Sequence, residues 1–114
     1  MKRQDIRIAI ARHQQFIDRA VAMIEADAAG HDLSEEQQFY QLELEALDST
    51  TAMLVHDALG RAPAAEEWQA PGTYAFANQP QGSQWSSMGW IKTYRRALQM
   101  SKGYLEALLE ATPE

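Results

Sequence analysis

The sequence contains no cysteine, so disulfide bonds, thiol nucleophiles and thiolate metal sites are all excluded. It also lacks a run of about 18 apolar residues, the length that a membrane-spanning helix requires. Hydrophobic residues still make up 46% of the 114 and charged residues 23%, as in chains that fold around a core. We therefore expect one soluble, cytoplasmic domain over residues 1–114 that does not contact a membrane.

The sequence patterns of common catalytic and metal sites are missing as well. There is no Glu-x-x-His pair of the kind that di-iron bundles use, no serine in a glycine-flanked nucleophile elbow and no glycine-rich phosphate loop. His31 and Glu35 are four residues apart, but a loop and a helix start separate them. We expect no catalytic residue, no metal and no cofactor, and thus a protein that is not an enzyme.

Apolar residues recur at helical spacing near the start of the chain. One row steps by four and three residues and consists of Ile6, Ile10, His13, Ile17, Ala20 and Ile24. Such a row lies on one face of a helix. Gly30 favours a helix end, because glycine tolerates left-handed backbone. The pattern predicts a helix over residues 4–29.

A second row has the same steps and consists of Tyr40, Leu44, Leu47, Thr51, Leu54 and Ala58. Ser34 with Gln37 three residues later suits a capping box at the helix start, and Gly60 and Pro63 end the pattern. These signals predict a helix over 35–60. The short loop before it makes the first two helices an antiparallel hairpin.

A third row consists of Ile91, Tyr94, Leu98, Ser101, Leu105 and Leu108, and it predicts a helix over 88–111. Three long helices of similar length, with a mean spacing near 3.5 residues, favour an all-α fold in which they pack nearly parallel as a bundle. Such a bundle could leave enough apolar surface to associate as a homodimer.

The connection over 61–87 is long, since helical bundles usually need two to eight residues there. We predict a short helix over 63–69, a turn over 70–73 and an extended piece over 74–77, with the rest irregular. A chain of this length can reach past the end of a helix and back. The sequence therefore allows the last helix to run either parallel or antiparallel to the second.

Charge is strongly segregated along the chain, whose formal net charge is −6. Eleven acidic residues between Glu25 and Glu67 face a single cation, Arg61. From Trp68 to Leu105 there are four cations and no acidic residue. The domain can satisfy these charges internally, or the basic segment can face a partner.

The same basic segment holds all three tryptophans. Tryptophan, tyrosine and arginine are enriched at binding hot spots. We predict a partner-binding surface made of Trp68, Tyr74, Phe76, Trp85, Trp90, Lys92, Arg95, Arg96 and Lys102. The alternative is that the aromatic residues of the connection pin it onto the bundle.

His13 lies on the buried row of the first helix, where an unpaired polar group is costly. Counting back from the hairpin places it opposite Thr50 and Thr51, and Ser101 lies on the inner row of the last helix. We predict a buried polar layer of these four residues that fixes the register of the helices.

Three functions follow from these patterns. The first is a non-catalytic protein-binding module, such as an adaptor, an assembly chaperone or an inhibitor of a larger complex. The second is binding of single-stranded nucleic acid by the same aromatic and basic residues, although the net charge of −6 counts against it. The third is a small-ligand pocket or enzyme centred on His13.

Overall fold

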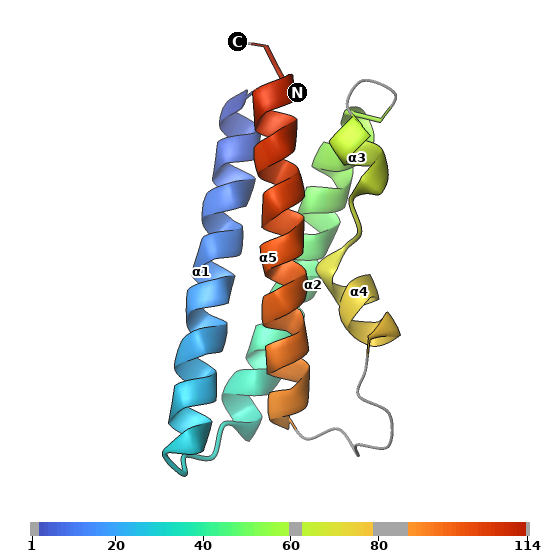
Figure 1. Cartoon of the computed structure of the whole chain (residues 1–114). Coiled ribbons are helices and arrows are strands. Elements are labelled where there is room, and N and C mark those ends of the chain that lie inside the picture. The colour runs from blue at the N-terminus through green and yellow to red at the C-terminus, as the bar shows by residue number, and fades with distance from the viewer. Residues whose placement is uncertain (1–2, 60–62, 79–86, 114) are drawn as a thin grey trace.

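The computed structural model describes residues 3–59, 63–78 and 87–113, and within them the chain is all-α, without a strand (Figure 1). The helices are α1 (Arg3–Ala28), α2 (Ser34–Asp57), α3 (Pro63–Glu67), α4 (Pro71–Ala77) and α5 (Ser87–Ala111). They form an elongated bundle of 47 × 26 × 18 Å. No helix in the described ranges is both long and apolar enough to cross a bilayer.

The structure decides the direction of the last helix. The Nη1 group of Arg3 at the start of α1 donates hydrogen bonds to the carbonyls of Leu109 (2.6 Å) and Thr112 (2.7 Å) at the end of α5. Helix α5 therefore runs antiparallel to α1, and these two helices pack closely along their length (Figure 1). Since α2 is also antiparallel to α1, α5 runs parallel to α2.

This direction explains the long connection. To enter α5 parallel to α2, the chain must first return along the whole bundle, and α3 and α4 occupy this return path beside α5 (Figure 1). Helix α4 also packs on α2. The arrangement is an up-and-down bundle of four rods in which the third rod is broken into two short helices.

The core consists of two apolar clusters separated by a polar layer. The cluster near the hairpin includes Phe16, Ile17, Tyr40, Leu44, Leu47, Ile91 and Leu98. The cluster near the chain ends includes Ile6, Ala9, Val55, Ala65, Leu105 and Leu108. His13, Thr51 and Ser101 are buried between these clusters, and each has at most 2% of its surface exposed.

Two local predictions are wrong. Residues 71–77 form the helix α4 rather than a turn followed by an extended piece, because Pro71 starts a helical turn and packs inward with Ala75. Two inward positions are too few to distinguish helix from strand in the sequence. The predicted capping box is also absent: Ser34 lies inside α2, and its backbone N–H (3.0 Å) and hydroxyl (2.6 Å) both donate to Asp32 Oδ1.

Candidate functional site

The middle of the bundle contains a chain of three hydrogen-bonded side chains. His13 Nε2 lies 2.8 Å from Ser101 Oγ, so the layer joins α1 to α5 as the sequence predicts. Trp68, which follows α3, donates its indole Nε1–H to the same oxygen at 2.7 Å. The other ring nitrogen of the histidine, Nδ1, lies 2.8 Å from the carbonyl of Ala9.

The chemistry of these groups fixes where the protons are in the neutral state. The Ala9 carbonyl can only accept, so His13 carries its proton on Nδ1 and donates it there. Nε2 is then an acceptor for the Ser101 hydroxyl proton, while the serine oxygen accepts from Trp68. Each of these three side chains has a hydrogen-bond partner, and neither ring nitrogen of His13 is left over for a ligand.

Burial lowers the pKa of His13 below its ordinary value of 6.5. The hydrogen bond to Ala9 opposes this decrease in pKa, and the positive charges of Arg12 and Lys102 add to it. The neutral imidazole is therefore the form that the folded chain favours at neutral pH. This agrees with the proton positions deduced from the hydrogen bonds.

The predicted threonine members of the layer do not join this chain. Thr51 is buried but donates to the carbonyl of Leu47 in its own helix, at 2.7 Å. Thr50 is exposed and bonds the carbonyl of Ala46, so its prediction as a buried residue is wrong. Sequence analysis missed Trp68 as the third member. The one signal in the sequence that could have indicated Trp68 is that the N–H of a packed indole needs a hydrogen-bond acceptor.

The predicted aromatic residues take different positions. Trp68 and Tyr74 are half-buried, and the Trp68 ring packs against the cluster near the chain ends. Trp90 is half-buried and stacks on Tyr94, with ring centroids 5.3 Å apart and planes tilted by 22°. Phe76 is 70% exposed. Of these rings, Phe76 is the one that α4 presents mainly to solvent.

Trp85 lies outside the described residues.

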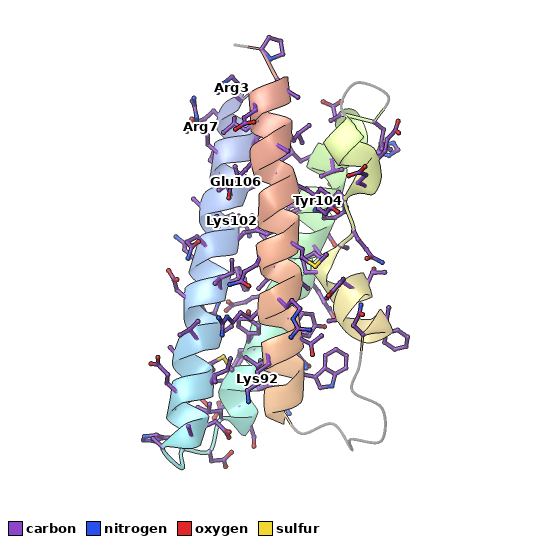
Figure 2. The ribbon with its side chains drawn as sticks, viewed as in Figure 1. Arg3, Arg7, Lys92, Lys102, Tyr104 and Glu106 are labelled. Carbon is purple, nitrogen blue, oxygen red and sulfur yellow. The ribbon has the colours of Figure 1, made fainter. Side chains whose placement is uncertain are left out.

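The predicted cations of α5 differ in their exposure and contacts. Three are exposed: Lys92, Arg95 and Arg96. Lys102 instead donates to Gln14 of α1 at 2.7 Å and pairs with Glu106 at 3.7 Å. Figure 2 shows Lys102 and Glu106 on the α1 side of α5 and Tyr104 on the opposite side.

Helix geometry separates the aromatic residues of α5 from its exposed cations. With about 100° of rotation per residue, Lys92, Arg95 and Arg96 each lie at least about 120° around the helix from Trp90. Trp90 also has one ring face covered by Tyr94. Trp90 and the exposed cations therefore lie on different sides of α5, and the predicted binding residues do not form one interleaved patch.

Within the described parts of the chain, no three or more His, Asp or Glu side chains gather closely enough to hold a metal ion. Comparison with known proteins finds no matching family model, no matching curated sequence and no matching solved structure.

Proposed function

We propose that the chain is a small non-catalytic protein-binding module, acting as an adaptor, an assembly chaperone or an inhibitor of a larger complex. Its contact surface is the outer side of α4 together with the first half of α5. The observation that carries the proposal is Phe76, a large aromatic residue that is 70% exposed on α4, a helix that packs beside α5 (Figure 1). Large aromatic residues and arginine are both enriched at interface hot spots.

Charge favours an acidic partner. The exposed cations Lys92, Arg95 and Arg96 lie in a stretch of α5 that has no acidic residue before Glu106, although the whole chain has a net charge of −6. A partner with carboxylates opposite this stretch is attracted to one side of an otherwise acidic molecule. Such complementarity increases the association rate and sets the orientation of binding.

The separation of rings and cations favours a protein partner over single-stranded nucleic acid. A strand needs stacking platforms with free ring faces directly beside its phosphate contacts. Trp90 is stacked on Tyr94, and the cations lie on another side of the helix. A protein interface covers about 800 Å² on each partner, enough to include both sides of α5.

The test is affinity capture from the native cell, with a photo-crosslinker placed at position 76 to identify the bound protein. Phe76→Ala and Arg96→Ala should each weaken binding of that protein by roughly tenfold or more. The matched control is Arg7→Ala, which removes an exposed cation from α1. Equal binding by all variants would refute the proposal. A salt titration with a steep log-log decline in affinity would assign the surface to nucleic acid instead.

Association as a homodimer and a cytoplasmic location stay predictions of the sequence. Sedimentation equilibrium of the full chain measures the first, and fractionation of the native cell measures the second.

A further inference from the structure

Helix α2 is apolar on two sides, and only one of them faces the core. The inward side carries Tyr40, Leu44 and Leu47, each at most 1% exposed. On the outward side, Phe39 is 56% exposed, Leu42 63% and Met53 75%. Large apolar side chains grouped at this exposure on one helix are uncommon in a domain that binds nothing there.

The outward residues have the spacing of a helix-packing seam. Phe39, Leu42, Ala46, Ser49 and Met53 follow one another at alternating steps of three and four residues. This is the a and d pattern by which one helix packs along another at a shallow angle. The partner that best fits this side of α2 is therefore another helix.

A groove extends the same surface toward α1. It has a volume of about 170 Å³. Its lining residues are Asp5, Ile8, Ala9 and Arg12 of α1 and Leu47, Thr50, Thr51 and Leu54 of α2, so it carries one charge of each sign. Ile8 is 49% exposed. Helices α1 and α2 meet at the hairpin and diverge toward the start of α1 (Figure 1).

The exposed apolar area is large enough for docking. Side chains of this size at these exposures present about 100 Å² each, so Ile8, Phe39, Leu42 and Met53 together offer roughly 400 Å². A stable interface buries about 800 Å² on each partner. The apolar residues thus supply about half of one side, and polar flanks must supply the rest.

Those flanks are acidic. Helix α2 contains six acidic residues and no lysine or arginine. Glu35 and Glu45 are exposed on the outward half of the helix, beside the apolar row. Pairing α2 with α2 of a second copy would place acidic flanks against acidic flanks, which is unfavourable.

We propose that the outward face of α2, with the groove beside it, binds an amphipathic helix of another protein whose apolar row is flanked by lysine and arginine. The apolar row sits on Leu42 and Met53, and the cations face Glu35 and Glu45. This surface is separate from Phe76 and Arg96, so the two proposals can fail independently.

The test uses two synthetic helical peptides of about 20 residues with leucine at every a and d position. One has lysine at the flanking positions, and the other has glutamate. Binding to the full chain is measured by fluorescence anisotropy of the labelled peptide. The lysine peptide should bind, and the glutamate peptide should bind at least about tenfold more weakly.

Leu42→Gln combined with Met53→Gln should weaken binding of the lysine peptide by about tenfold or more. Met100→Gln is the matched control, because it removes an exposed methionine from α5 and should leave the affinity unchanged. Glu45→Gln should weaken binding and reduce its dependence on salt. Circular dichroism checks that each variant folds, as expected for side chains that are mostly in solvent.

Three results would overturn the proposal. The first is no binding of the lysine peptide, or binding that the α2 variants do not change. The second is equal affinity for both peptides, since this would remove the role of charge. The third is a full-length dimer in sedimentation velocity that Met53→Gln dissociates, because a second copy would then cover the face.

Discussion

Replacing Ser101 by alanine should destabilise the fold more than replacing His13 by leucine. The Ser101 hydroxyl serves two partners, since it donates to His13 Nε2 and accepts from Trp68 Nε1–H. Removing it leaves both groups without a partner. An unsatisfied buried polar group costs about 1–3 kcal/mol. His13 is fully buried and Trp68 is half-buried, so we expect a total loss of about 3 kcal/mol.

His13→Leu, by contrast, leaves no buried polar group without a hydrogen-bond partner. The Ser101 oxygen still accepts from Trp68, and its proton can turn to a carbonyl in the preceding turn of α5. Leucine has a similar volume and lies between two apolar clusters. We therefore expect the loss in stability to stay within about 1 kcal/mol.

Urea unfolding followed by circular dichroism at pH 7.5 measures both effects. With a slope of about 1.5 kcal/mol per M, Ser101→Ala should lower the unfolding midpoint by about 2 M. The double variant should be more stable than Ser101→Ala alone, because the leucine removes the unsatisfied imidazole. Equal losses for the two single variants, or losses that simply add, would contradict the proposed proton arrangement.

Three further predictions concern the contacts that hold the helices together. Asp48 accepts the backbone N–H of Gly72 at 2.9 Å, and burial raises the pKa of Asp48 to about 6. Because the folded pKa lies above the unfolded value of 3.8, its contribution to stability is greatest below pH 3.8 and is lost as the pH rises through 6. Asp48→Asn should thus stabilise the chain at pH 7.5 by on the order of 1 kcal/mol, a value reduced for the partial exposure of the side chain. At pH 4 the stabilisation should be much smaller. Urea unfolding at the two pH values measures the difference. Gly72→Ala should destabilise the fold, because a Cβ there meets Asp48 Oδ2 at 2.8 Å, and the loss should shrink in an Asp48→Ala background. Arg3→Ala should cost about 1–2 kcal/mol and speed amide hydrogen exchange in the last turn of α5, where two carbonyls lose their donor, and unchanged exchange would contradict the capping role.

The long helices could be predicted from the sequence because their rows extend over many turns. The structure begins and ends α1 and α5 within one residue of the predicted 4–29 and 88–111, and it ends α2 at Asp57, three residues before the predicted end. Helix α4 was out of reach, since seven residues carry only two inward positions. Its stability comes from packing on α2 and α5, which no local pattern records.

The candidate site also has residues that the sequence could predict and residues that it could not. Helical spacing alone puts His13 and Ser101 on inward faces, and a buried imidazole needs a partner whatever the topology. Local spacing says nothing about Trp68, because its partner lies 33 residues away on another helix. The rotation of Trp90 away from the cations of α5 follows from 100° per residue, but its stacking partner and the contact of Lys102 with α1 depend on neighbouring side chains.

By itself, the sequence determined where the three long helices lie and which side of each faces the core, because both follow from residues within a few turns of one another. The tertiary structure decided that α5 runs parallel to α2, that α3 and α4 fill the return path and that Phe76 faces solvent. These outcomes depend on which helices bury their apolar sides against one another. The contacts involved join residues far apart in the chain, so they are decided only when the helices pack in three dimensions.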